Sequence, residues 1–250
     1  MREQAHFNAD YVRAFAANSR LAQRVAVIGM HLYSDLPSDG GAELRTLIQN
    51  SAYSSSRLWM TEYGDLEQSG EREWFVAWTM TGRLFALLEA GFQAALAWDA
   101  FDNYHDHDEW WTLYGLLRSG LRVYTPKKRY FAAKQVYRFV RPGFVRVEAA
   151  AHLLDHVRLL AFVNEARTLV TVTGMNVSDR SIYVNVRFEH LSDDLKTQSL
   201  SYYRTSEYEN CVHVGHVLVR RGEYGGGNYG FDGAVIEVPA FSIFTLTNVT

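Results

Sequence analysis

The chain has 250 residues, of which 48% are hydrophobic, so it is long enough to bury one large core or two modest ones. Its net charge of −3 argues against a nucleic-acid-binding surface, and no apolar run approaches the ~18–20 residues of a membrane span. The single cysteine, Cys211, excludes an intramolecular disulfide and a cysteine-based zinc site.

The first 141 residues alternate apolar strands with helical patterns, which is typical of βα units and a parallel sheet. Strands are predicted over 25–33, 57–62 and 92–98, and helices over 8–21, 42–50, 71–88 and 126–139, with Pro126 near the first turn of the last helix. The only basic cluster, Lys127-Lys128-Arg129, is interpreted as a solvated helix end. A (β/α)8 barrel takes about 250 residues by itself, so the predicted strands make only part of one.

The pattern changes at Pro142-Gly143. Beyond it, short alternating segments are separated by turn residues, which predicts antiparallel strands over 157–163, 168–173, 182–188, 212–219 and 235–246. The predicted fold class is therefore α/β plus all-β. A partial TIM-type barrel occupies residues 1–141, and a β-sandwich side domain occupies residues 142–250.

Glu62 is the first candidate for chemistry because it ends the strand over 57–62. In a parallel barrel the carboxyl ends of the strands form the catalytic face, so a carboxylate there indicates a catalytic group; the alternative is a surface glutamate. His31 and Tyr33 end the preceding strand two residues apart, so both side chains face the same side. The Tyr33 hydroxyl could then hydrogen-bond Glu62 and keep it ionised. The alternative is a core histidine and a packing aromatic.

Trp98 ends the third strand, where its ring either forms the floor of a sugar subsite or packs at the barrel mouth. The following segment, residues 99–109, is rich in carboxylates and imidazoles but does not fit the EF-hand pattern, so we interpret it as a polar loop at the rim of a site and expect no metal. No P-loop, dinucleotide fingerprint or nucleophile elbow is present, and we expect no cofactor.

Five segments, taken in order, resemble glycoside hydrolase family 30 of the clan A glycosidases. The most specific are the W-x-[ST]-E-[YF]-G motif at 59–64 and the stretch KRYFAAKQVYRFVRPG at 128–143. The continuation after Glu62, with Ser69-Gly70, resembles galactanase-type members. The five segments are VAVIGMHLYS at 25–34, RLWMTEYGDLEQSG at 57–70, FQAALAWDAF at 92–101, KKRYFAAKQVYRFVRPGFVRVEA at 127–149 and EVPAFSIFTLTNV at 237–249.

The resemblance implies strands six to eight of the barrel and a retaining hydrolase of β-linked poly- or oligosaccharides. Glu62 then matches the nucleophile, while His31, Tyr33 and Trp98 match residues around the sugar. Asp99 stands where many relatives have Gln or Trp, and it is included among the expected substrate-binding residues. A carbohydrate is the expected substrate, with no nucleic acid and no membrane as partner.

The resemblance also implies an acid/base glutamate in an upstream Asn-Glu pair, and this chain has no such pair before Glu62. Asn164-Glu165 lies between two predicted sandwich strands and is interpreted as a turn. Three hypotheses remain. The chain is part of such a glycosidase, or a catalytically dead carbohydrate-binding or scaffold protein derived from one, or an enzyme whose barrel is completed by a partner chain or a homo-oligomer. Complete relatives are extracellular or periplasmic, whereas the N-terminal MREQAHFNAD has no apolar signal region, so the localisation stays open.

Overall fold

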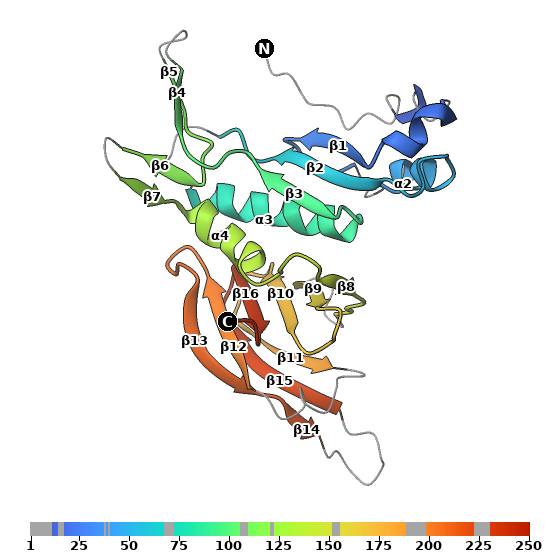
Figure 1. The fold of residues 1–250 in the computed structure, drawn as a ribbon. Coiled ribbons are helices and arrows are strands. Elements are labelled where there is room, and N and C mark those ends of the chain that lie inside the picture. Colours follow the sequence, from blue (N-terminus) through green and yellow to red (C-terminus); the bar gives the residue numbers. More distant parts are fainter. Residues whose placement is uncertain are drawn as a thin grey trace. The chain divides into compact units, whose positions relative to one another are not determined.

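The computed structural model describes residues 12–14, 18–37, 39, 41–67, 73–105, 110–120, 123–151, 156–188, 199–222 and 231–250. The chain folds into two compact units, Met1–Tyr130 and Phe131–Thr250 (Figure 1). The predicted domain boundary after residue 141 stays a prediction.

The first unit is built on a three-stranded parallel sheet with the order β1-β2-β3. These strands are β1 (Val27–Leu32), β2 (Arg57–Tyr63) and β3 (Ala94–Ala97), so all three strands expected from the sequence are present. The helices α2 (Ala42–Gln49) and α3 (Glu73–Glu89) connect them, and α3 packs against β2 and β3 (Figure 1).

Apolar side chains explain why α3 covers the sheet. The residues that it buries recur at helical spacing and include Val76, Met80, Leu84 and Leu87. The helix expected over 8–21 lies largely outside the described residues: residues 12–14 are helical, and a 3-10 helix, η1, follows at Ser19–Arg24. No helix in the described part of the chain is long and apolar enough to cross a membrane.

Two short hairpins follow β3, and the sequence did not predict them. The first pairs β4 (Asn103–His105) with β5 (Trp110–Thr112), and the second pairs β6 (Leu117–Ser119) with β7 (Tyr124–Pro126). Pro126 therefore ends a strand rather than lying in the first turn of a helix, and α4 spans Lys128–Tyr137.

The interpretation of Lys127-Lys128-Arg129 as a solvated helix end was wrong. Lys127 and Arg129 are both buried. Lys127 Nζ lies 2.7 Å from Asp102 Oδ1, and Arg129 Nη2 lies 2.8 Å from Glu73 Oε1. Each cation is paired with a carboxylate distant in sequence, as burial of a charge requires.

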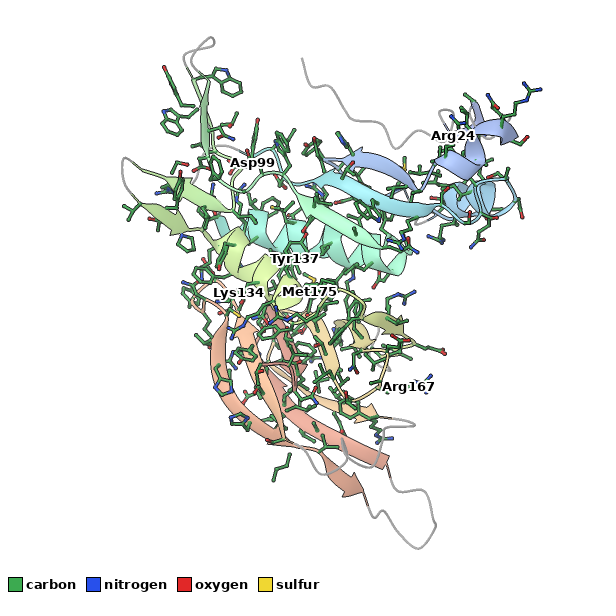
Figure 2. All side chains as sticks on the ribbon, viewed as in Figure 1. Arg24, Asp99, Lys134, Tyr137, Arg167 and Met175 are labelled. Atoms are coloured by element: carbon green, nitrogen blue, oxygen red, sulfur yellow. The ribbon has the colours of Figure 1, made fainter. Side chains whose placement is uncertain are left out.

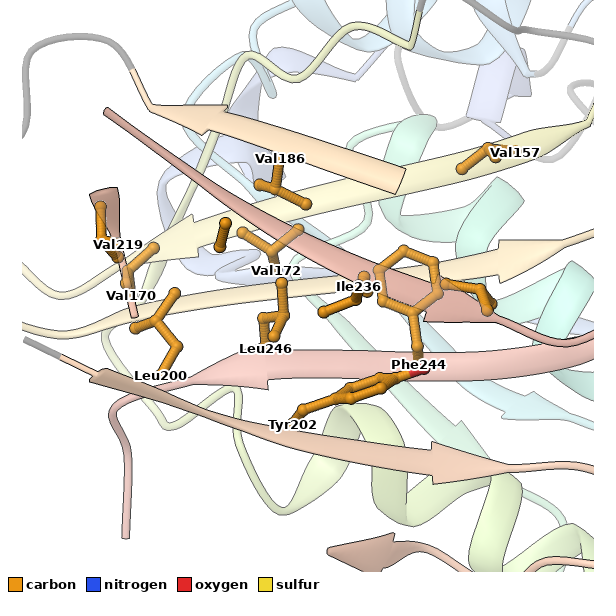
Figure 3. Packing of buried hydrophobic residues seen from close by; sticks show 12 residues of the cluster. Val157, Val170, Val172, Val186, Leu200, Tyr202, Val219, Ile236, Phe244 and Leu246 are labelled. Atoms are coloured by element: carbon orange, nitrogen blue, oxygen red, sulfur yellow. The ribbon is translucent and has the colours of Figure 1, made fainter. Parts of the chain in front are cut away.

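The second unit consists of two antiparallel sheets with the orders β13-β12-β16-β10-β9-β8 and β11-β15-β14. Inward side chains from both sheets form one apolar core, drawn in Figure 3, in which Val172, Leu246 and Phe244 lie among Val186 and Ile236. The strands are β8 (Val145–Val147), β9 (Val157–Val163), β10 (Val170–Asn176), β11 (Ile182–Phe188), β12 (Ser199–Thr205), β13 (Val212–Leu218), β14 (Arg220–Gly222), β15 (Phe231–Val238) and β16 (Ser242–Thr247).

The predicted bounds of β9 and β11 are confirmed, whereas the single strand expected over 235–246 is in fact two. Pro239 stands where β15 ends, and proline has no backbone N–H to donate within a sheet. The strands β8, β12 and β14 were not predicted from the sequence.

Buried threonines join α4 to the six-stranded sheet. Within the second unit, the hydroxyls of Thr205, Thr245 and Thr171 donate to the carbonyls of Phe131, Gln135 and Phe139, at 3.3, 2.8 and 2.9 Å. Phe131 and Gln135 are four residues apart, so their carbonyls lie on one side of α4, and Phe139 lies in the turn that follows the helix. This face of the sheet is rich in threonine and looks polar in sequence, yet it packs against the segment that contains α4, and the hydroxyls donate hydrogen bonds to its carbonyls.

Candidate active site

The candidate site lies at the carboxyl ends of the parallel strands β1 and β2. The pairing of these strands places His31 opposite Glu62, after a register shift between Met30 and His31. Thr61 Oγ1 donates to the carbonyl of Met30 at 3.0 Å and ties the two strands together just before their ends. Side chains at the ends of neighbouring parallel strands meet at one edge of the sheet.

Both predicted neighbours of Glu62 contact the same carboxylate oxygen. The Tyr33 hydroxyl donates a hydrogen bond to Glu62 Oε2, and His31 Nδ1 lies 3.3 Å from that atom. The Glu62 side chain is 25% exposed, so the carboxylate is held by protein on one side and open to solvent on another. The structure thus brings together three of the five residues singled out from the sequence.

The electrostatics of Tyr33 fix its role as a donor. Burial, the hydrogen bond to Glu62 and the nearby charges of Glu62 and Asp99 all raise the pKa of Tyr33 well above its usual value of 10.0. The phenol therefore stays protonated across the physiological pH range. A permanently protonated donor on one oxygen keeps the carboxylate oriented.

Trp98 and Asp99 lie where β3 ends, and Figure 2 labels Asp99 there. The backbone N–H of Trp98 donates to the carbonyl of Tyr63 at 2.8 Å, its ring is exposed, and the peptide bond between Trp98 and Asp99 is cis. Asp99 Oδ2 accepts a hydrogen bond from Asn103 Nδ2 at 2.8 Å, while Oδ1 is buried and has no hydrogen-bond partner among the described residues. Burial raises the pKa of Asp99, against the opposing effect of the Asn103 hydrogen bond.

Two residues that sequence reasoning missed shape the loops around Glu62. A Cβ on Gly64 would lie 2.8 Å from the carbonyl oxygen of Trp98, so only glycine allows the β2 and β3 ends to approach this closely. Arg83 of α3 donates from Nη1 to the Gly64 carbonyl at 2.5 Å and lies 3.1 Å and 3.3 Å from carboxylate oxygens of Asp35 and Asp65. One guanidinium therefore holds the loops that follow β1 and β2.

A buried ion pair organises the segment after β3. The side chains of Lys127 and Asp102 are 5% and 2% exposed, and Lys127 Nζ also donates to the Leu113 carbonyl at 2.9 Å. Asp102 Oδ1 accepts from the backbone N–H of Gly115 at 3.0 Å. Burial lowers the pKa of Lys127, against the opposing effect of its hydrogen bond to Asp102. The sequence itself indicated a special role for Lys127 only through the family resemblance of the stretch that begins at residue 127.

Asn164-Glu165 lies in a turn between β9 and β10, as expected. Asn164 Oδ1 accepts from the backbone N–H groups of Thr168 and Leu169, both at 2.8 Å, which explains the asparagine by turn chemistry. Of the residues considered as metal ligands, 106–109 lie outside the described residues. Elsewhere in the described part, no three His, Cys, Asp or Glu side chains gather in a way that could hold a metal ion.

Comparison with known proteins gives structural matches alone. No protein-family profile and no curated sequence matches the chain. A GH30 endoxylanase from Clostridium papyrosolvens C71 matches with a TM-score of 0.71 at 18% identity, over 100% of this chain and 55% of that one. A GH30 subfamily 8 xylanase, Xyn30A, from Clostridium acetobutylicum gives 0.68 at 17% identity, over 99% and 54%. The endo-β1,6-glucanase BT3312 gives 0.62 at 15%, over 96% and 45%.

At these identities the likeness concerns the fold. The chain spans about half the length of the solved structures that it matches. Two of those structures are GH30 enzymes, and they align with essentially all of this chain, including the strand ends that carry Glu62. The chain has the fold of part of a glycoside hydrolase of family 30.

Proposed function

We propose that the chain is the carboxyl-terminal part of a retaining glycoside hydrolase. Strands β1–β3 and their helices would be part of a (β/α)8 barrel, and the two antiparallel sheets would be its β-sandwich side domain. The parallel order β1-β2-β3 and the likeness to GH30 structures over the whole chain support this assignment. The substrate would be a β-linked carbohydrate.

Glu62 is the proposed nucleophile. Its carboxylate would attack the anomeric carbon of the sugar and release the aglycone oxygen, and water would then hydrolyse the glycosyl-enzyme ester. Tyr33 and His31 would hold Glu62 Oε2 and so direct the other oxygen at the sugar. Trp98 would stack on the sugar, and Asp99 would hydrogen-bond one of its hydroxyls.

The observation that carries this proposal is the pair of contacts on one oxygen of Glu62. A surface glutamate at a strand end has no need of a partly buried tyrosine donor and an imidazole on the same atom. Two contacts on Oε2, with the side chain still partly exposed, are what a nucleophile needs: a fixed orientation and access to substrate.

The acid/base of a retaining mechanism lies ~5–5.5 Å from the nucleophile and is the missing part of the proposal. We propose that it comes from outside the present chain, either from further sequence of a longer protein or from a partner chain that completes the barrel. The second candidate function is a carbohydrate-binding or scaffold protein without catalysis, which the exposed Trp98 beside the carboxylates would also serve.

The test bypasses the missing acid. A 2-deoxy-2-fluoro-β-glycoside with a dinitrophenolate leaving group needs no proton donor to form the glycosyl-enzyme, and the fluorine slows its hydrolysis. Xylosyl, glucosyl and galactosyl reagents are incubated with the chain, and intact mass and peptide mapping are recorded. We expect one sugar per chain, attached to Glu62.

The matched variants are Glu62→Gln and Glu207→Gln, which remove the same charge at the candidate site and at an exposed position. Labelling of Glu207→Gln but not of Glu62→Gln supports the proposal. Labelling that survives Glu62→Gln removes Glu62 from the mechanism. Folded protein that binds sugars but is never labelled favours the second candidate function.

A further inference from the structure

The hairpin β4–β5 displays large aromatic side chains to solvent. Tyr104 and Trp111 are 46% and 48% exposed, and Trp110 is exposed as well. Tyr104 and Trp111 face each other across the two strands, with ring centroids 5.4 Å apart and the planes tilted by 48°. Exposed aromatic groups of this size usually mark a binding surface, because water solvates them poorly.

The base of this hairpin is fixed, although a two-stranded hairpin alone is at best marginally stable. Asp102 directly precedes β4 and is held by Lys127 and by the Gly115 N–H. Thr112, the last residue of β5, is buried, and its hydroxyl donates to the Asn103 carbonyl at 3.3 Å. The aromatic rings therefore stand on an anchored support.

The hairpin is continuous with the candidate active site. Asn103, its first residue, donates to Asp99, which follows Trp98 at the end of β3. Figure 1 shows β4 and β5 extending beyond the carboxyl ends of β1–β3. Exposed rings thus occur both at Trp98, where β3 ends, and on the hairpin that the Asn103–Asp99 hydrogen bond joins to that strand end.

We propose that the β4–β5 hairpin binds sugar units of a carbohydrate chain that extend beyond the unit at Glu62, so that the preferred ligand is an oligo- or polysaccharide. The inference rests on the proposed function. Flat rings offer electron-rich faces to the polarised C–H groups of a sugar, while the Asp99 carboxylate nearby accepts from hydroxyls. A purely hydrophobic partner would cover the Asp99 carboxylate, which accepts one hydrogen bond from Asn103, without adding another.

The experiment measures affinity against ligand length. Calorimetric titration of the chain with xylo- and gluco-oligosaccharides of two to six units is expected to show affinity that rises with length. Trp111→Ala should weaken binding of the six-unit ligand about tenfold, as loss of a stacked aromatic anchor typically does, with a smaller effect on the two-unit ligand. Trp111→Phe should restore most of the affinity, since it keeps a ring.

Tyr208→Ala serves as the control because it removes an exposed aromatic from the second unit, and its affinities should match the unaltered chain. Equal affinity of Trp111→Ala and the unaltered chain for six units overturns the proposal. A chain that binds no oligosaccharide also overturns it. Sedimentation measures self-association, and the proposal is likewise overturned if the unaltered chain self-associates and Trp111→Ala abolishes that self-association instead of sugar binding. Failure of Glu62 labelling with Trp111-dependent binding intact refutes the nucleophile and leaves the hairpin assignment standing.

Discussion

Replacing Lys127 with methionine tests the buried ion pair beneath the hairpins. Methionine keeps the length of the side chain but removes its charge, so Asp102 loses the ammonium at 2.7 Å and Leu113 loses a donor at 2.9 Å. Breaking one partner of a buried pair costs about 3–5 kcal/mol, because the other charge stays buried and uncompensated. With a urea m-value of about 2 kcal/mol/M, the unfolding midpoint should fall by roughly 2 M.

The assay can be confined to the first unit. All six tryptophans lie in it, at positions 59, 74, 78, 98, 110 and 111. Tryptophan fluorescence in a urea titration therefore reports the unfolding of Met1–Tyr130, and far-UV circular dichroism follows both units. If the two units unfold in separate transitions, the fluorescence midpoint still belongs to the first unit, because only that unit contains tryptophan.

The double variant Lys127→Met/Asp102→Asn separates the charge effect from simple loss of packing. An asparagine oxygen can still accept from the Gly115 N–H, so the double variant should recover a large part of the lost stability. A midpoint lowered by less than about 0.5 M in Lys127→Met alone would contradict the expected energy of the ion pair. Additive effects of the two substitutions would contradict it as well, because contacting charges must couple.

Three further predictions concern Asp99, Tyr33 and Thr245. Burial raises the folded-state pKa of Asp99 above its usual value of 3.8. The stability of the unaltered chain relative to Asp99→Asn should therefore fall as the pH rises from 3.8 through the folded-state pKa. Urea unfolding midpoints, followed by fluorescence at pH 3.5 and at pH 7, measure this difference. Tyr33→Phe removes a hydrogen bond to a charged group worth about 1.5–3 kcal/mol and should slow fluoro-sugar labelling of Glu62 about ten- to a hundredfold. Thr245→Val removes the bond to the Gln135 carbonyl and should cost the second unit about 1–2 kcal/mol by circular dichroism.

Each of these predictions has a result that contradicts it. A difference between Asp99→Asn and the unaltered chain that does not change with pH would show that the carboxyl titrates alike in the folded and unfolded states. Unchanged labelling rates in Tyr33→Phe would remove the phenol from the site. If Thr245→Val is as stable as the unaltered chain, the hydrogen bond to the Gln135 carbonyl contributes no net stability to the second unit.

The strands that could be predicted from the sequence are those with a long run of apolar or alternating residues. The three parallel strands follow from largely apolar runs. The bounds of β9 and β11 were predicted correctly because turn residues follow the apolar run of β9 and precede the alternating residues of β11. The hairpins β4–β5 and β6–β7 escaped because a strand of three residues shows no period. The strand β12, SLSYYRT, escaped because its outward residues are polar or aromatic and its inward ones are few.

The candidate site was foreseen in part for a related reason. Period-2 spacing places His31 and Tyr33 on one side, and the parallel arrangement brings them to Glu62. The supports of the site depend on tertiary contacts instead. Arg129 is 56 residues from its partner Glu73, and Lys127 is 25 residues from Asp102, so nothing local to the basic cluster signals burial.

The threonines against α4 set the angular position of that helix. Successive helical residues are about 100° apart around the axis, so inserting one residue between Phe131 and Phe139 would turn part of the helix away from the sheet. Gln135 and Phe139 could then no longer both face their hydroxyls. Single-residue insertions and deletions should therefore be tolerated far less in this segment than in the turn at Asn164, whereas apolar exchanges elsewhere on the helix leave the alignment intact.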